Sequence, residues 1–147
     1  MKPERTDRVL QSAEKQAESF ERVRQAHLME ATEDYVELID DLIQCHGEAR
    51  LVDVAERLGI SQPTASKTLT RLQRDGYVTS EPYRSIFLTD KGKELADKSR
   101  VRHDVVFRFL LSIGVTAAVA ERDSEGLEHH VSDETLRAFK KIINEKS

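Results

Sequence analysis

Hydrophobic positions recur at helical spacing over most of this chain. The first strong stripe consists of Tyr35, Leu38, Ile39, Leu42 and Ile43 and predicts a helix that ends at Gly47. A weaker, alanine-rich stripe precedes it, formed by Leu10, Ala13, Ala17, Phe20 and Val23. This weaker pattern predicts a helical N-terminal extension over residues 1–30, either a partly ordered arm or a segment packed on the rest of the protein or on a partner.

The next apolar positions predict two short helices joined by a tight turn. The first helix covers residues 51–58 and stops at Gly59, and Ser61 is a good N-cap for the second. The small side chain of Ala55 lets the two helices approach closely. The inner face of the second helix, which is expected to end near residues 75–76, is formed by Ala65, Leu69 and Leu72. This arrangement predicts a helix-turn-helix, whose second helix can lie in a DNA major groove.

Beyond this unit the pattern predicts a small wing and then helices. Two β-prone runs, at residues 77–79 and 86–88, favour a two-stranded hairpin with a loop at its tip. A long helix is expected over about residues 91–112, followed by one that starts near Thr116 and one capped by Ser132. The predicted fold is therefore mainly α, with a winged helix-turn-helix followed by a helical part.

Composition narrows the setting of the protein. A chain of 147 residues can bury an adequate core, and its single cysteine, Cys45, excludes an intrachain disulfide. No Cys-x-x-Cys pair is present, which argues against a structural zinc site. The N-terminus lacks the apolar run of a signal peptide, and no window approaches the ~20 apolar residues that cross a membrane. We therefore expect a cytoplasmic protein without a membrane partner.

Charge is distributed unevenly along the chain. The formal net charge is -4, yet residues 57–102 contain ten Lys or Arg against five acids and carry +5. The basic middle segment suits phosphate contacts, and the acidic remainder suits cation binding or simple solvation. The residues expected to face DNA on the second helix and the wing are Ser61, Gln62, Pro63, Thr64, Ser66, Lys67, Arg71 and Arg84. The alternative is a helical hairpin whose polar face only meets water.

Carboxylates and histidines recur at spacings that suit metal binding. Asp34 and Glu37 share one helix face, and Glu125, Glu128 and His129 share a face of the helix that starts near Thr116. His103, on the long helix, can complete such a site. Each group alone has an ordinary explanation as a macrodipole or ion-pair partner. Together they favour a divalent cation, and ligands without thiolate or thioether favour Mn²⁺, although other divalent ions would also bind in vitro. The remaining helical histidines, His27, His46 and His130, are expected to be surface or second-shell groups.

Several of these motifs resemble the diphtheria toxin repressor family of metal-dependent regulators, and within it the manganese-responsive type. The resemblance covers roughly residues 33–143 and is carried by Asp34-Tyr35-Val36-Glu37, Ser61-Gln62-Pro63-Thr64, Leu88-Thr89-Asp90-Lys91-Gly92, Arg102-His103 and Glu125-Gly126-Leu127-Glu128-His129-His130. It implies a winged helix-turn-helix DNA-binding domain at residues 31–92 and a helical metal-binding and dimerisation domain at 93–147. It also implies a two-metal Mn²⁺ site with ligands Asp34, Glu37, His103, Glu125, Glu128 and His129. We expect no SH3-like domain.

The function expected from this resemblance is a homodimeric, Mn²⁺-dependent transcriptional regulator. It would bind double-stranded operator DNA, most simply as a repressor of manganese uptake genes, and would use no small organic substrate. Iron-responsive relatives have a thioether and a thiol at the positions of Asp34 and Glu128, where this chain has carboxylates. The alternatives are a metal-independent winged-helix regulator and, from another class, a di-metal carboxylate enzyme in a helix bundle.

Overall fold

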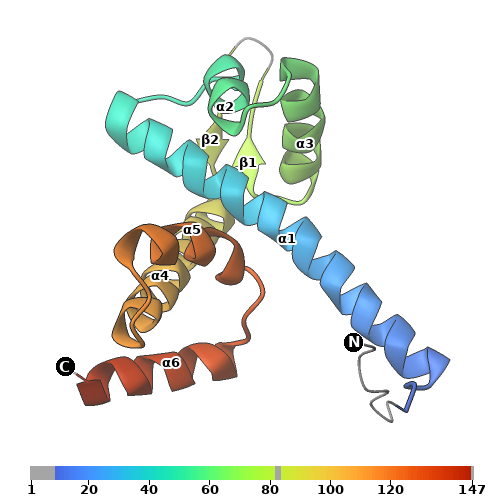
Figure 1. The fold of residues 1–147 in the computed structure, drawn as a ribbon. Helices are drawn as coiled ribbons and strands as arrows, with labels where there is room; N and C mark the ends of the chain where they lie inside the picture. Colours follow the sequence, from blue (N-terminus) through green and yellow to red (C-terminus); the bar gives the residue numbers. More distant parts are fainter. Residues whose placement is uncertain (1–8, 82–83, 147) are drawn as a thin grey trace, which may run out of the picture.

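The computed structural model describes residues 9–81 and 84–146, which fold mainly into helices (Figure 1). The elements are α1 (Ala13–His46), α2 (Leu51–Leu58), α3 (Gln62–Arg74), β1 (Val78–Thr79), β2 (Phe87–Leu88), α4 (Asp90–Ser112), α5 (Ala117–Leu127) and α6 (Asp133–Lys146). The mainly α fold with a small wing is thereby confirmed. Residues 1–8 of the expected extension and the loop residues 82–83 lie outside the described residues.

The expected extension and the first core helix form one helix. Ser12 caps α1 by accepting a hydrogen bond from the Lys15 amide, and Gly47 ends it in the left-handed conformation at φ 81°. No glycine or proline interrupts the 34 residues between these caps, so the helix continues through residue 30 without a break. Its N-terminal half projects from the body of the molecule as an arm (Figure 1).

The DNA-binding part has a core of its own. Side chains from α1, α2, α3 and the hairpin contribute to it, namely Tyr35, Ile39, Leu42, Ala49, Val54, Leu69, Leu72, Val78 and Ile86. The strands pair antiparallel with Val78 opposite Leu88, and a bridge between Ala49 and Ile86 adds a third segment to the wing. This core fixes α3 against the wing, with the outer face of α3 free.

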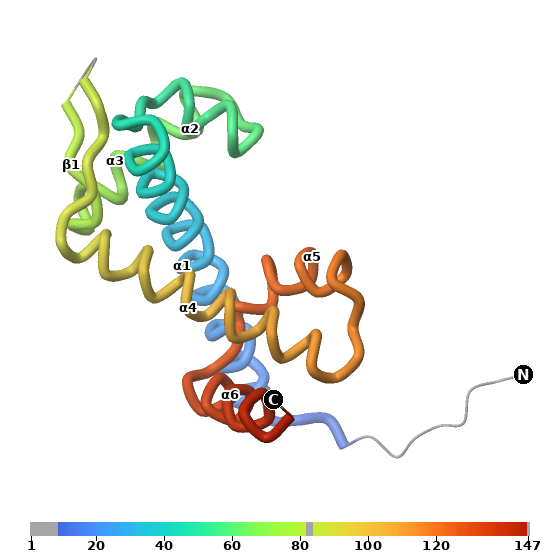
Figure 2. The backbone as a smooth tube through the Cα atoms, turned by 90° about the vertical axis from the view of Figure 1, so that its left-hand side faces the viewer, coloured from blue at the N-terminus to red at the C-terminus, as the bar shows by residue number. Residues whose placement is uncertain are grey.

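Helix α4 connects this core to a second one. Figure 2 shows α4 running from the hairpin past α1 to the C-terminal helices. At its start, Gly92 lies so close to the backbone that a Cβ there would be 2.1 Å from the carbonyl oxygen of Tyr77. Its C-terminal half packs on α5 and α6 through a second cluster, which consists of Val105, Val106, Leu110, Ala120 and Leu136.

Ion pairs hold α1 against α4 near the DNA-binding part. The buried Asp40 accepts hydrogen bonds from Lys93 at 2.9 Å and from Arg100 at 2.6 Å, and Arg100 also pairs with Asp41. Burial favours the protonated acid, but these hydrogen bonds outweigh it and lower the pKa of Asp40.

Among the described residues no helix is long and apolar enough to cross a membrane.

Candidate metal centre and nucleic-acid interface

The six predicted ligands lie where α1, α4 and the end of α5 meet. Asp34 and Glu37 are on α1 and His103 is on α4. The expected helix that carries the Glu-Glu-His group ends earlier than predicted: α5 stops at Leu127, so Glu128 and His129 lie in the following turn. Two features explain this early end. Gly126 weakens the last turn, and the Arg102 guanidinium donates to the carbonyl of Glu128 at 2.9 Å.

Glu128 is at the centre of the cluster. Its Oε1 lies 3.3 Å from His129 Nε2, and its Oε2 lies 3.3 Å from His103 Nδ1. His129 Nε2 is also 3.2 Å from Asp34 Oδ1. The side chains of Glu128 and His129 are only 4% and 1% exposed. The turn after α5 is therefore connected to both α1 and α4 through buried polar side chains.

Two of these buried atoms have no hydrogen-bond partner among the described residues: Glu128 Oε2 and His129 Nε2. Each has an oppositely polar atom at ion-pair distance but without hydrogen-bond geometry. Leaving a buried polar group unsatisfied costs about 1–3 kcal/mol. A cation coordinated by these atoms would remove that cost, and the carboxylate and imidazole donors are ligands that divalent metals use. The residues present therefore fit the metal ion that their types imply.

The pKa values of the cluster also indicate that its side chains suit a cation. The pKa of Glu128 is raised to about 7, mainly by burial and also by the nearby carboxylates of Glu37 and Glu125, against the opposing effect of the histidines. Burial would lower the pKa of His129, but its interactions with Asp34 and Glu33 raise it to about 10. Burial also raises the pKa of Glu37. Without a cation the cluster holds protons, which metal binding would displace.

Three supporting residues were missed by sequence reasoning. Glu33 is hydrogen-bonded to His129 Nδ1 and directs Nε2 toward the centre, as carboxylates commonly do for ligating histidines. Ser99 Oγ donates to Glu37 Oε2 at 3.0 Å, and Glu121 lies 3.3 Å from His103 Nε2. Glu121 is four residues before Glu125 and shares its face, which is a usable signal. Nothing in the sequence distinguishes Glu33 or Ser99 from other polar residues on their helices.

Among the described residues three groups of side chains could hold a metal ion, and the two that contain predicted ligands each face one oxygen of Glu128. One group combines Glu30, Asp34 and His129, and the other combines His103, Glu121 and Glu125. Within each group the ligand atoms lie within 4.8 Å of one another. Glu37 is connected to both His103 and Glu128 through its charge. The Glu128 carboxylate therefore lies between two groups of side chains of metal-ligand type.

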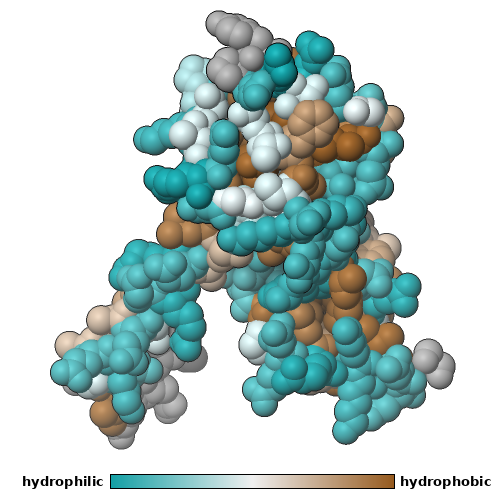
Figure 3. Space-filling view, turned by 180° about the vertical axis from the view of Figure 1, so that it is seen from behind, coloured by the Kyte–Doolittle hydropathy of each residue, from teal (hydrophilic) through white to brown (hydrophobic). Residues whose placement is uncertain are grey.

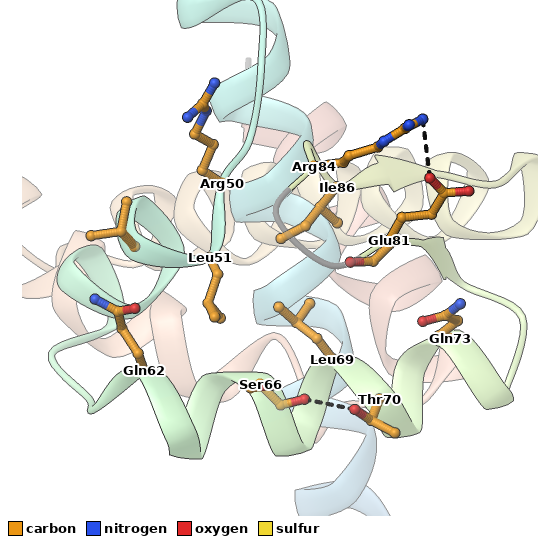
Figure 4. Close-up of a pocket in the computed structure, with 12 residues that line it drawn as sticks. Arg50, Leu51, Gln62, Ser66, Leu69, Thr70, Gln73, Glu81, Arg84 and Ile86 are labelled. Atoms are coloured by element: carbon orange, nitrogen blue, oxygen red, sulfur yellow. Dashed lines mark hydrogen bonds and ion pairs between the residues drawn. The ribbon is translucent and has the colours of Figure 1, made fainter.

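The predicted DNA-facing residues line the outer surface of α3. Ser61 Oγ accepts from the Thr64 amide at 3.3 Å and caps the helix, so Ser61, Pro63 and Thr64 shape its exposed first turn. Gln62, Ser66 and Thr70 follow at steps of four and face a groove of about 700 Å³. Figure 4 shows these three side chains on α3, with Arg84 and Glu81 of the wing across the groove.

A basic stripe accompanies this polar one. Lys67, Arg71 and Arg74 lie along the neighbouring side of α3, and Arg84 of the wing is exposed and 3.1 Å from Glu81. Such a surface has short polar groups for base edges and cations for phosphates. The prediction omitted Arg74, which continues the basic stripe, as well as Arg50 and Gln73, which line the groove. The steps between residues 67, 71 and 74 are a signal that could have identified Arg74.

Two family models match consecutive parts of the chain. Residues 27–86 match the model of the iron dependent repressor N-terminal DNA binding domain. Residues 89–146 match the model of the iron dependent repressor metal binding and dimerisation domain. The boundary between the matches falls just before α4.

Several known proteins are similar to this chain over most of its length. The transcriptional regulator MntR of Escherichia coli O6:H1 is 53% identical over 131 residues, which is 89% of this chain and 84% of that protein. The MntR of Salmonella typhimurium strain LT2 is 54% identical over 130 residues, covering 88% and 83%. A solved manganese-dependent transcriptional repressor in complex with manganese matches with a TM-score of 0.69 and 27% identity over 77% of this chain. This chain spans about half the length of that solved chain, 52%.

Proposed function

Because the chain belongs to the iron-dependent repressor family, as a transcriptional regulator of the MntR type, we propose that it binds operator DNA as a homodimer when Mn²⁺ occupies the cluster around Glu128. The observation that carries this proposal is the buried pair Glu128 and His129. Their unsatisfied atoms are surrounded by ligand side chains from three helices. A hydrophobic or fully hydrogen-bonded junction would be more stable in the absence of a cation.

The proposed ligands are Asp34, Glu37, His103, Glu125, Glu128 and His129. We propose two ions per chain because the two oxygens of Glu128 face different ligand groups. Carboxylates and imidazoles without a thiolate favour Mn²⁺ over softer ions. Glu33 and Ser99 would orient His129 and Glu37 through the hydrogen bonds described above.

The position of the cluster explains how binding of a cation can affect DNA binding. A bound cation supplies the positive charge that offsets the repulsion among the carboxylates. Asp34 and Glu37 lie on either side of Tyr35, the first residue that α1 contributes to the DNA-binding core, whereas Glu128 and His129 follow α5, which packs with α4 around the second core. Held together, these residues fix the orientation of α3 relative to the C-terminal part. In a dimer this sets the separation of two α3 helices, which must suit major grooves ~34 Å apart.

The dimer surface is proposed on the C-terminal part. Residues 89–146 match a dimerisation model, and several large apolar side chains there are exposed, namely Val101, Leu111, Ile113 and Leu127. Figure 3 shows hydrophobic surface on this part of the molecule. Burying such surface between two copies favours association.

The proposed role is repression of manganese uptake genes in the cytoplasm, with no organic substrate.

A metal-dependent binding assay tests the proposal. Duplexes selected from a randomised library in the presence of Mn²⁺ are titrated with wild-type protein at increasing Mn²⁺. We expect DNA affinity to rise about 5- to 150-fold with Mn²⁺, and Glu128→Ala to retain only the metal-free affinity. Glu94→Ala removes an exposed carboxylate from α4 and is the matched control, which should behave like wild type. Equal DNA binding with and without Mn²⁺ by all three proteins would contradict the proposal.

A further inference from the structure

A second cluster of metal-ligating side chains lies beside the centre, on the arm side. His27 and Glu30 are on α1, and His130 directly follows His129. Glu30 Oε2 is 3.1 Å from His130 Nε2 and 3.6 Å from His27 Nδ1. The two imidazole rings meet edge to face with their centroids 5.2 Å apart. The sequence analysis interpreted His27 and His130 as surface or second-shell groups and gave them no shared role.

These three residues come from distant parts of the chain. His27 and Glu30 are one turn apart on α1, and His130 is 100 residues after Glu30. Their side chains are 64%, 28% and 34% exposed for His27, Glu30 and His130, so an ion can reach them from solvent. The cluster lies where the arm of α1 last touches the turn after α5.

The spacing of the ligand atoms suits a single ion. Metal to nitrogen and oxygen distances of about 2.0–2.1 Å place the ligands of a tetrahedral zinc about 3.4 Å apart. The observed separations of 3.1 and 3.6 Å lie on either side of that value, and all three ligand atoms lie within 4.8 Å of one another.

We propose that His27, Glu30 and His130 form a separate site for a borderline divalent cation of the Zn²⁺ type, which clamps the arm to the turn after α5. Two imidazoles and one carboxylate favour such an ion, in contrast to the oxygen-rich cluster around Glu128. A fourth position remains for water or another ligand, because His27 faces solvent. Glu30 also lies within the group of Asp34 and His129, so the new site adjoins the Mn²⁺ centre.

Occupancy of this site would change the arm. Most side chains before His27 are exposed, with Leu10 at 80% and Phe20 at 57%. Amide hydrogens in such a segment exchange readily because few contacts oppose local opening. A clamp at residues 27 and 30 would therefore slow exchange in the adjoining turns, about residues 20–30, without any requirement for DNA.

The test is a count of zinc bound by the full chain. Equilibrium dialysis against Zn²⁺ followed by elemental analysis is applied to wild type, His27→Ala, His130→Ala and His46→Ala. His46 is an exposed histidine on the same helix, away from the cluster, and provides the matched control. We expect wild type and His46→Ala to bind one more Zn²⁺ per chain than His27→Ala and His130→Ala. Zn²⁺ should also slow amide exchange over residues 20–30 in wild type and not in His27→Ala.

Zinc can also enter the centre around Glu128, so the count is repeated in a Glu128→Ala background. The difference of one zinc between Glu128→Ala and the double variant Glu128→Ala, His27→Ala should persist. That result is independent of whether the neighbouring centre binds Mn²⁺. Equal zinc counts and equal affinities for wild type and His27→Ala would overturn the proposal and leave only a hydrogen-bonded His–Glu–His cluster.

Discussion

The proposed DNA-facing surface and the proposed metal centre of this molecule are built in opposite ways. The DNA-facing surface consists of exposed side chains on consecutive turns of α3, together with Arg84 from the wing. The proposed metal centre combines the buried Glu128 and His129 with partly exposed side chains from α1 and α4 and with the exposed Glu125 of α5. The first surface depends on one helix, whereas the second depends on the relative positions of three.

This difference has an energetic side. Exposed polar groups on α3 remain solvated, so they cost the fold little. Glu128 is buried with an unsatisfied oxygen and a pKa raised to about 7, so its charged form destabilises the metal-free fold. Substitutions on α3 should therefore change DNA binding alone, whereas removal of the Glu128 charge should weaken metal binding and stabilise the metal-free fold.

The largest effect is expected from Glu128→Gln, which keeps the shape of the side chain and removes its charge. Mn²⁺ affinity should fall by more than the 10- to 100-fold typical of residues outside the ligand set. The metal-free protein should become more stable above pH 7, by on the order of 1 kcal/mol, because the buried charge is gone. Mn²⁺ titration and thermal unfolding with a chelator measure both. Glu94→Gln is the control, and a variant that loses both affinity and stability would contradict the energetic argument.

The next effect is expected at Glu33, which contacts the centre only through His129. Glu33→Ala should weaken Mn²⁺ binding about 10- to 100-fold, and Glu33→Gln by less, because an amide oxygen can still accept from Nδ1. At saturating Mn²⁺ both variants should bind DNA like wild type. A graded metal affinity with unchanged saturated DNA binding separates a positioning residue from a direct contact. Equal Mn²⁺ affinity in Glu33→Ala and wild type would show that His129 needs no such support.

The same contrast explains what sequence reasoning could and could not find. Periodicity identified α2 and α3 because their caps and apolar faces are local, and it identified Gln62 and Ser66 because exposed positions follow from the buried ones. It did not find that α1 is continuous, although no residue between Ser12 and Gly47 breaks a helix. The weak apolar stripe of the N-terminal extension predicted either a partly ordered arm or a segment packed on the rest of the protein. Choosing between the two requires the position of the C-terminal part.

The spacing of residues in the sequence alone could not show which side chains converge in the proposed metal centre. Asp34, His103 and Glu128 are far apart in the chain, and their grouping came from metal-ligand residue types on separate predicted helices and from a family resemblance. The end of α5 at Leu127 depends on Arg102, which holds the Glu128 carbonyl from another helix. Glu33 could be assigned only when its histidine partner was in place, whereas the spacing of Glu121 from Glu125 was a signal that could have identified it. Local sequence patterns predict the helices and strands, whereas contacts between distant parts of the chain determine which side chains meet.

A smaller effect is expected on the DNA side from the double substitution Lys67→Ala, Arg71→Ala. Loss of two phosphate contacts should weaken DNA binding roughly 10- to 30-fold at ~0.15 M salt and reduce the slope of log affinity against log salt by about 2. Mn²⁺ stoichiometry and stability should not change, because both side chains lie away from the centre. DNA binding measured across a salt series tests this, with Lys140→Ala on α6 as the control. A double variant with the wild-type salt slope would exclude α3 from the phosphate contacts.

The smallest effect is the pH dependence of the metal-free protein. The pKa of Glu128 is raised from 4.5 to about 7, so the folded state holds a proton that the unfolded state has lost, and stability falls as pH rises through this window. The pKa of His129 is raised from 6.5 to about 10, so its stabilising contribution is complete below pH 6.5 and is lost as pH rises through 10. Each group changes the free energy of unfolding by at most ~1.4 kcal/mol per pH unit. Chelator-treated wild type should therefore lose stability from pH 5 to 7 relative to Glu128→Gln, whereas Mn²⁺ affinity should rise over the same range as protons are displaced. Parallel stability curves for the two proteins would place the titrating proton elsewhere, and the metal centre would then cost the fold no more than the DNA-facing surface does.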